Sequence, residues 1–250
     1  MASFSKIEWT DATWTPIRAR NLETGKTGWH CQHVSPGCEN CYSETLNRRI
    51  GSGLAFKPGH LKAVDVFLDE KMISAPMRWR SPRRIFVCSM TDLFGEWMRD
   101  EWIDRVFDIV EQAPQHIYQI LTKRAYRMQW YFEDRFAGCI PKNAWVGVSV
   151  ENDEYLERIY ELRQIPAAVR FLSLEPLLSS IENIDLRGIH WVIVGGESGP
   201  RKRPVDLAWM RSIRDQCLAA GVPLFVKQID KRIPIPEDLM IRQWPKGAEQ

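Results

Sequence analysis

Six short apolar runs in the last two thirds of the chain constrain the fold more than any other feature. They are rich in β-branched and aromatic residues and cover 83–90, 117–123, 144–150, 169–175, 190–196 and 223–228. Apolar and polar residues do not alternate within them, so both faces of each run are expected to be buried. Strands buried on both faces are typical of a parallel sheet.

Segments with helical periodicity lie between these runs. Residues 100–113, 153–165 and 206–221 each place apolar side chains on one face of a 3.6-residue period. The last segment begins at Asp206, a suitable N-cap, and ends at Gly221, a residue suited to a helix C-terminus. Strand–helix alternation with this spacing predicts right-handed βαβ units.

With a candidate first strand at 12–16, the pattern predicts an α/β fold: a complete or partial TIM-type (β/α) barrel of parallel strands. An open doubly wound sheet is the alternative. We expect a single domain over 1–250, with a cysteine-containing loop over 17–44. Residues 51–82 are rich in Gly, Pro, Lys and Arg and are expected to form a lid or excursion.

Composition narrows the class of protein. The 250 residues are 44% hydrophobic, which is enough for a substantial core without stabilising disulfides. Six cysteines are too few for a disulfide scaffold, and no apolar run reaches the roughly 20 residues of a membrane-spanning helix. The N-terminus lacks a hydrophobic signal core. We therefore expect a cytoplasmic protein with reduced thiols and no membrane association.

Polar residues stand at the carboxyl end of every run. Because these ends share one edge of a parallel sheet, they predict a polar pocket there. Any single member is equally explained as a helix cap or a solvated turn, but the whole set favours a site. Its members are Ser89, Thr91, Asp92, Thr122, Lys123, Arg124, Ser149, Glu151, Asn152, Ser173, Glu175, Glu197, Ser198, Lys227 and Gln228.

Two further motifs indicate ligand contact. In "VIVGGESG", Gly195 and Gly196 would let the backbone approach a ligand before Glu197, although a tight βα turn is the alternative. The motif is neither GxGxxG nor a P-loop. In "MRWRSPRRIF", the arginines, including Arg80, could contact phosphates while Trp79 stacks on a base. A solvated loop paired with local acids explains them equally well.

Three of the six cysteines, Cys31, Cys38 and Cys41, are spaced C-x6-C-x2-C in "CQHVSPGCENC". The C-x2-C half is a common metal-chelating spacing. Zinc would need a fourth ligand, which His30 or His33 could supply. The remaining cysteines are expected to be small buried side chains: Cys88, Cys139 and Cys217.

An iron–sulfur cluster with one open iron is the interpretation we favour over zinc, and the zinc alternative stays open. An open iron can hold S-adenosylmethionine, as in radical enzymes, and such a cluster suits the loop after the first strand of an α/β barrel. Tyr42, after the third cysteine, would shield it. The C-x3-C-x2-C spacing typical of radical enzymes is not present.

These motifs together resemble a phage and prophage protein family known for a three-cysteine motif and without a settled function. The similar stretches are "TWTP", "CQHVSPGCENCYSE", "RRIFVCSMTDLFGEW", "APQHIYQILTKR", "WVGVSVEN", "VRFLSLEPLL", "WVIVGGESG" and "CLAAGVPLFVKQ", from about Trp14 to Gln228. The three cysteines match the family's cysteines. Its strand-end motifs match Asp92, Lys123, Arg124, Glu151, Glu175, Glu197, Lys227 and Gln228. The inserted "IRARNLETGKTGWH" before the first cysteine departs from the family pattern.

The resemblance implies a distant relation to radical S-adenosylmethionine enzymes. It also implies a methyltransferase-like "three-Cys-motif partner" protein and a location in the host cytoplasm if the chain is phage-encoded. We therefore expect an enzyme with a 4Fe–4S cluster that generates a 5′-deoxyadenosyl radical and uses an external electron donor. Its expected substrate is a nucleic-acid base or nucleotide, for modification or repair.

The residues then take four expected roles. The cluster ligands are Cys31, Cys38 and Cys41; the cofactor-binding residues are Ser89, Asp92, Gly195, Gly196 and Glu197. The catalytic residues are Lys123, Glu151, Glu175 and Lys227; the substrate-binding residues are Trp79, Arg80, Arg124 and Gln228. The alternatives are a zinc-stabilised, non-catalytic nucleic-acid-binding protein and a metal-free hydrolase.

Overall fold

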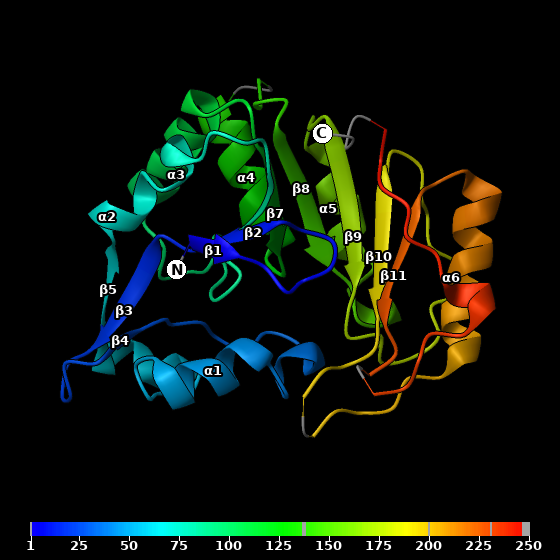
Figure 1. Ribbon diagram of the computed structural model, residues 1–250, viewed down its shortest axis with the longest axis horizontal. Helices are drawn as coiled ribbons and strands as arrows, with labels where there is room; N and C mark the ends of the chain where they lie inside the picture. The colour runs from blue at the N-terminus through cyan, green and yellow to red at the C-terminus, as the bar shows by residue number, and fades with distance from the viewer. Residues whose placement is uncertain (1, 137–138, 200, 231, 247–250) are drawn as a thin grey trace. The chain divides into compact units, whose positions relative to one another are not determined.

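The computed structural model describes residues 2–136, 139–199, 201–230 and 232–246 (Figure 1). The chain divides into two compact units, Met1–Leu121 and Thr122–Gln250. Each unit has strands and helices of its own. The single domain expected over 1–250 stays a prediction.

The first unit contains the start of the parallel sheet. Strand β2 (Ala12–Trp14) pairs in parallel with β6 (Arg84–Val87), which pairs in parallel with β7 (Ile117–Thr122). The short β1 (Ala2–Phe4) runs antiparallel to β2. The strands predicted at 12–16, 83–90 and 117–123 are confirmed, with ends up to three residues shorter.

A second, antiparallel sheet of the first unit was not predicted. Its order is β4-β3-β5, with β3 over Ile17–Asn21, β4 over Thr27–Gly28 and β5 over Val64–Leu68. Buried and outward-facing residues alternate along β3, which is the pattern of a strand with one covered face. The loop expected over 17–44 and the excursion expected over 51–82 therefore share regular structure.

Short helical elements complete the first unit. They are η1 (Pro36–Cys38), α1 (Tyr42–Ile50), η2 (Pro58–Ala63), α2 (Glu70–Ile73), η3 (Pro76–Arg78) and α3 (Asp100–Gln112). Helix α3 confirms the prediction over 100–113. Residues 51–82 thus hold two 3-10 turns, a strand and a short helix, and their role as a lid stays a prediction.

The second unit carries four parallel strands in chain order, drawn side by side in Figure 1. They are β8 (Ala144–Ser149), β9 (Val169–Leu174), β10 (Trp191–Gly195) and β11 (Leu224–Gln228), and they confirm the last four predicted strands. Every residue of β8 and β10 is buried. The absence of polar alternation predicted this burial correctly.

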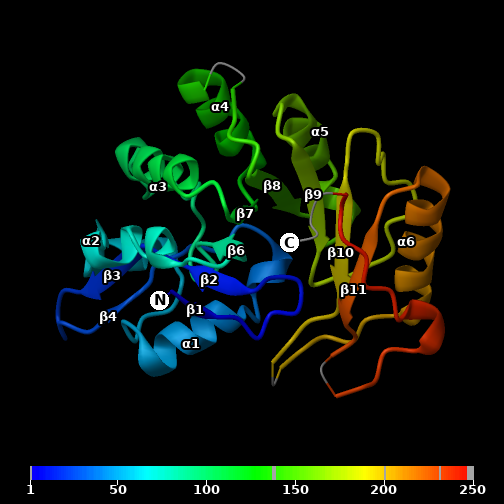
Figure 2. The ribbon, with the colours of Figure 1, turned by 45° about the horizontal axis from the view of Figure 1, so that its top comes forward.

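Helices α4 (Ala125–Phe136), α5 (Glu157–Gln164) and α6 (Leu207–Ala220) belong to the second unit, together with the turns η4 (Asp153–Tyr155) and η5 (Glu237–Leu239). Figure 2 shows α5 and α6 beside the strands of this unit. Asp206 caps α6 through Ala208 N at 2.8 Å, and Gly221 ends it at φ 66°. Helix α4 was not predicted, since the exposed Tyr126 and Trp130 obscure its apolar face.

Aromatic side chains fill the core of each unit. In the second unit, the fully buried Trp191 packs against Trp145, Phe171 and Phe225, with ring centroids 5.8 to 6.2 Å apart. In the first, Trp14 packs edge-on against Tyr118 at 5.8 Å. Such offset and edge-on ring pairs stabilise a core beyond simple area burial.

Strand order settles the fold class. The parallel strands follow chain order within each unit, β2-β6-β7 and β8-β9-β10-β11, whereas a doubly wound sheet reverses its order at a switch point. The fold class is α/β, a half-barrel with seven parallel strands among the described residues, as the partial-barrel prediction expected. Within the same residues, no helix is long and apolar enough to cross a membrane.

Candidate functional site

The cysteine segment, residues 29–44, joins β4 to α1 in the first unit. Pro36 opens the 3-10 turn that contains Cys38, because its fixed φ suits the first position of a helical turn. The amide of Cys41 donates to the carbonyl of Cys38 at 3.3 Å, and Cys41 is the N-cap of α1. The C-x2-C half of the motif is therefore a tight turn leading into a helix.

A buried asparagine holds the two ends of this segment together. The Oδ1 of Asn47 accepts from the amides of Trp29 at 2.9 Å and Ser52 at 3.1 Å. Its Nδ2 donates to the Ser52 hydroxyl and to the Leu54 carbonyl, both at 2.9 Å. The bond from Trp29 fixes the buried Asn47 of α1 to the backbone that precedes Cys31, and the other three bonds fix it to the residues that follow α1.

The cysteine segment is also bonded to the residues that follow β6. The Thr91 hydroxyl donates to the carbonyl of His30 at 2.5 Å, and the Tyr42 hydroxyl donates to the carbonyl of Ser89 at 2.8 Å. Asp92 accepts from the amide of Phe94 at 3.0 Å and is 8% exposed. The structure thus brings the three cysteines, Ser89 and Asp92 to one part of the unit.

Cys88, between β6 and Ser89, has φ 55°, in the left-handed region that costs a residue with a Cβ about 1–2 kcal/mol. Such strain gathers at functional turns. Burial raises the pKa of the Cys88 thiol, which is therefore neutral at physiological pH. Cys88 and Cys217 are buried as predicted, but Cys139 is exposed, because it lies in the loop after α4. The prediction for Cys139 was wrong.

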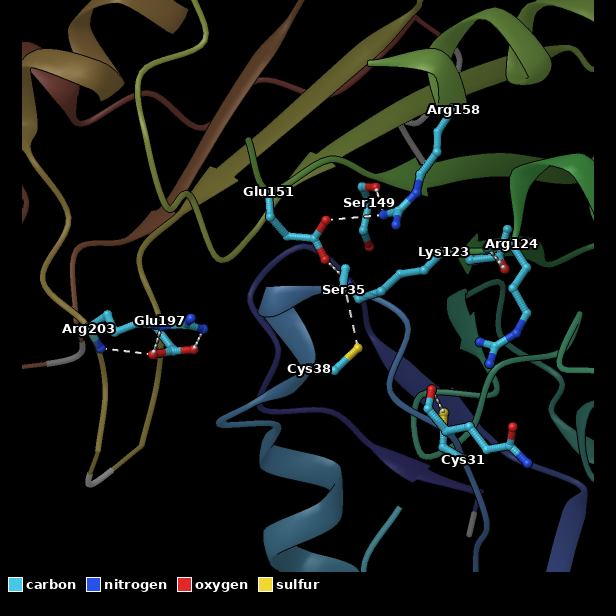
Figure 3. A network of polar contacts seen from close by, with 12 residues as sticks. Cys31, Ser35, Cys38, Lys123, Arg124, Ser149, Glu151, Arg158, Glu197 and Arg203 are labelled. Carbon is cyan, nitrogen blue, oxygen red and sulfur yellow. Dashed lines mark hydrogen bonds and ion pairs between the residues drawn. The ribbon is translucent and has the colours of Figure 1, made fainter. Parts of the chain in front are cut away.

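Each thiol of the motif has different surroundings. Cys31 packs against Trp29, Phe56 and Met90, with its Sγ 3.9 Å from the carbonyl of Gln32. The Sγ of Cys38 lies 3.8 Å from the Ser35 hydroxyl (Figure 3), and that of Cys41 lies 3.2 Å from the Ser43 hydroxyl. None of these cysteines forms a disulfide.

The donor set fits a three-thiolate metal centre, since three reduced cysteines share one segment and two of them share one turn. Their present positions do not yet form that centre. Among the described residues, no group of three or more His, Cys, Asp or Glu side chains is placed to hold a metal ion.

The two histidines differ in their contacts. His33 Nε2 lies 2.9 Å from a carboxylate oxygen of Glu44, which also accepts from the amide of Phe56. His30 is buried edge-on against Trp97, with ring centroids 5.1 Å apart. His33 thus belongs to a carboxylate–histidine pair, while His30 belongs to the aromatic packing.

In the second unit, Glu151 is the most deeply buried of the predicted catalytic residues, with no exposed surface. It is bonded to Lys123 Nζ, and Arg158 Nη1 lies 3.1 Å from its other oxygen (Figure 3). The same Arg158 atom donates to the carbonyl of Ser149 at 2.7 Å. Arg158, which sequence reasoning missed, fixes the carboxylate to the end of β8.

Two further carboxylates at strand ends are paired with cations. Lys227 Nζ donates to Glu175 at 2.5 Å. Arg203 holds Glu197 through its side chain at 2.6 and 3.1 Å and through its amide at 2.8 Å. The strand ends read "SVE", "SLE" and "GGE", a short repeat that sequence reasoning missed and that could have marked the three glutamates as a set.

The two glycines of "GGE" have different roles. A Cβ on Gly196 would lie 1.9 Å from the carbonyl of Ile229, so this position allows a close approach of two backbone segments. A Cβ on Gly195 would meet Glu175 at an ordinary 3.5 Å. The carbonyl of Gly196 also accepts from Gln228 Nε2 at 3.0 Å. The close approach of the Ile229 carbonyl therefore explains why residue 196 is a glycine.

The predicted substrate-binding residues belong to different units, Trp79 and Arg80 to the first and Arg124 and Gln228 to the second. Arg124 is buried in the second unit. Trp79 lies under the guanidinium of Arg83, 4.6 Å from its ring, and its carbonyl accepts from Gln115. Because Arg83 precedes β6 and Gln115 precedes β7, Trp79 and the adjacent Arg80 lie at the amino ends of these strands. Ser89 and Asp92 follow the carboxyl end of β6.

Comparisons with known proteins identify a family and two similar structures. The family model described as "Protein of unknown function (DUF5131)" matches residues 4–240. No curated protein matches the sequence. A structure of spore photoproduct lyase complexed with dinucleoside spore photoproduct is 12% identical over 86% of this chain, with a TM-score of 0.47.

A mutant spore photoproduct lyase with bound AdoMet and dinucleoside spore photoproduct is 11% identical over 86% of this chain, also with a TM-score of 0.47. The match covers 63% of each lyase chain. This chain therefore spans less than two thirds of their length.

Proposed function

The chain belongs to the DUF5131 family, whose function is unknown, and we propose that it is an iron–sulfur enzyme of the radical S-adenosylmethionine type. Cys31, Cys38 and Cys41 are the proposed ligands of a 4Fe–4S cluster. Bound there, the cluster would hold S-adenosylmethionine at its open iron and supply the electron for its cleavage.

One observation carries this proposal. The cysteine segment is bonded to the carboxyl end of β6 through Thr91 and Tyr42, and that end carries Ser89 and Asp92. In α/β folds the carboxyl ends of parallel strands are where ligands bind. A segment that carries three thiols and is fastened there by hydrogen bonds supports a metal centre with a cofactor role.

Charges in the second unit support an anionic substrate, which we propose to be a nucleotide or nucleic-acid base. Lysine and arginine side chains lie at or after the strand ends of this unit and are paired with carboxylates: Lys123 and Arg158 with Glu151, Lys227 with Glu175, Arg203 with Glu197, and Lys202 with Asp230. Lysine and arginine are the side chains that contact phosphate groups.

The chain's own residues would then bind and orient the ligands. Ser89 and Asp92 are the proposed contacts for polar groups of the cofactor. Lys123 and Lys227, each held by a glutamate, are the proposed contacts for the substrate. An external electron donor is needed, and the methyltransferase-like partner protein remains a proposed companion.

A zinc-stabilised nucleic-acid-binding protein is the second candidate, and His33 favours it. A zinc-bound histidine commonly donates its other ring nitrogen to a carboxylate, and His33 Nε2 makes such a contact with Glu44. With three thiolates, the remaining nitrogen of His33 would complete a four-ligand zinc site.

The test is cleavage of the cofactor. The protein, purified and reduced without oxygen, is mixed with S-adenosylmethionine, and 5′-deoxyadenosine is measured by chromatography. We expect its release from the wild type and from Cys139→Ser, and its loss from Cys38→Ser. An iron-loaded wild-type protein that releases none, with or without added oligonucleotides, would contradict the radical mechanism.

A further inference from the structure

The sulfur of Cys41 lies close to a serine hydroxyl. Its Sγ lies 3.2 Å from the hydroxyl of Ser43, a residue 7% exposed in the first turn of α1. The sulfur of Cys38 is 3.8 Å from the Ser35 hydroxyl, and that of Cys31 is 3.9 Å from a backbone carbonyl. Of these three contacts, the one between Ser43 and Cys41 is the shortest.

Local geometry directs the Ser43 hydroxyl to the sulfur. A serine in the first turn of a helix often turns its hydroxyl toward nearby backbone. Here the hydroxyl of Thr45 donates to the carbonyl of Cys41 at 3.2 Å. In the part of the chain that the structure describes, the sulfur of Cys41 is the contact made by Ser43 Oγ.

The direction of this hydrogen bond follows from the chemistry of a metal ligand. A cysteine binds a metal as a thiolate, which has no proton to donate. A serine hydroxyl has one proton and can donate it. Once Cys41 is a ligand, Ser43 is therefore the donor and the sulfur is the acceptor.

We propose that Ser43 donates a hydrogen bond to the Cys41 sulfur of the bound iron–sulfur centre and thereby raises its reduction potential. This inference rests on the proposed function. Reduction adds one electron, supplied by the external donor, and increases the negative charge on the sulfurs. A donated proton stabilises the reduced state more than the oxidised state, and hydrogen bonds to sulfur are among the factors that set cluster potentials.

The test is a mediated redox titration of the reconstituted proteins, followed by visible absorption. Ser43→Ala removes the donor, and we expect its reduction potential to be lower than that of the wild type. Ser43→Thr keeps a hydroxyl and is expected to restore the wild-type value. Ser35→Ala is the matched control, and its longer contact predicts a smaller shift.

Equal potentials for Ser43→Ala and the wild type would overturn the inference and leave the proposed function standing. A wild-type protein that takes up no iron would overturn both. Ser43→Ala is expected to fold, because alanine favours a helix more than serine does. Circular dichroism checks the folding of each variant.

Discussion

The cysteine segment of the first unit and the strand ends of the second hold their functional side chains in opposite ways. Around the cysteines, the links include neutral hydrogen bonds between backbone atoms and the side chains of Asn47, Thr91 and Tyr42. At the strand ends, carboxylates are held by cations: Glu151 by Lys123 and Arg158, Glu175 by Lys227, and Glu197 by Arg203.

The difference separates two kinds of chemistry. Carboxylates already paired with lysine and arginine are poorly available as metal ligands, whereas reduced thiols keep their capacity to bind a soft metal. The cysteine segment is therefore the better candidate for a metal centre. The strand ends of the second unit are better suited to binding charged organic groups.

Removing the most buried carboxylate should have the largest effect on the ion-paired region. Glu151→Gln leaves the buried guanidinium of Arg158 without its carboxylate partner, so we expect a loss of about 4 kcal/mol in the free energy of unfolding. Glu175→Gln, at a partly exposed pair, should cost about 1 kcal/mol. Urea denaturation measures the free energy of unfolding of both variants. Equal losses would show that burial of the ion pair does not determine how much stability each carboxylate contributes.

Removing the hydrogen bonds of Asn47 is the corresponding change in the cysteine segment. Asn47→Ala leaves the buried amides of Trp29 and Ser52 without their acceptor, and we expect a cost of about 3 kcal/mol. Iron uptake should fall as well, because the two ends of the cysteine segment are no longer joined. Asn183→Ala, at an exposed position, is the control. Full iron uptake by Asn47→Ala would show that the hydrogen bonds of Asn47 are not needed to position the cysteines.

The glycines at the end of β10 test the close backbone approach in the second unit. Gly196→Ala forces its Cβ against the Ile229 carbonyl and is expected to cost about 2 kcal/mol. Gly195→Ala has room and should change stability by less than about 0.5 kcal/mol. Thermal unfolding of the two variants checks this order. A larger effect at Gly195 would show that the Ile229 carbonyl does not approach Gly196 as closely as the structure gives.

The smallest effect should come from Asp230, whose partner Lys202 lies at 2.7 Å. The hydrogen bond from Lys202, with the amides of Ile233 and Arg232, lowers the pKa of Asp230 to about 2. A lowered carboxyl pKa stabilises the folded state above the unfolded value, about 4, and this contribution is lost as the pH falls toward 2.

Asp230→Asn should therefore be slightly less stable than the wild type near neutral pH and should match it near pH 2. Unfolding is measured across this range with Asp134→Asn as the exposed control. A stability difference that persists at the acid end would show that the charge is not responsible.

Much of the fold could be predicted because buried parallel strands leave a strong pattern. The runs around Trp145, Phe171 and Trp191 have no polar alternation, so their burial was predicted correctly. The antiparallel sheet of β3, β4 and β5 was missed, because β4 has two residues and Gly and Pro hide the short β5. Short strands depend on tertiary pairing more than on their own sequence.

The candidate site was only partly predictable. Strand-end position predicted Glu151, Glu175 and Glu197, because parallel strands present their ends at one edge. It did not predict Arg158 or Asn47, since both lie on helices and reach their partners through tertiary contacts. Trp79 was chosen for its residue type, and the structure places it at the amino end of the strands.

Metal content tests the central claim most directly. The wild-type protein and the Cys31→Ser, Cys38→Ser and Cys41→Ser variants are purified without oxygen and analysed for iron, sulfide and zinc. We predict about four irons and about four sulfides per wild-type chain, lost in each variant but kept in Cys217→Ser. A colourless wild-type protein with one zinc and no iron, before and after reconstitution, would contradict the account.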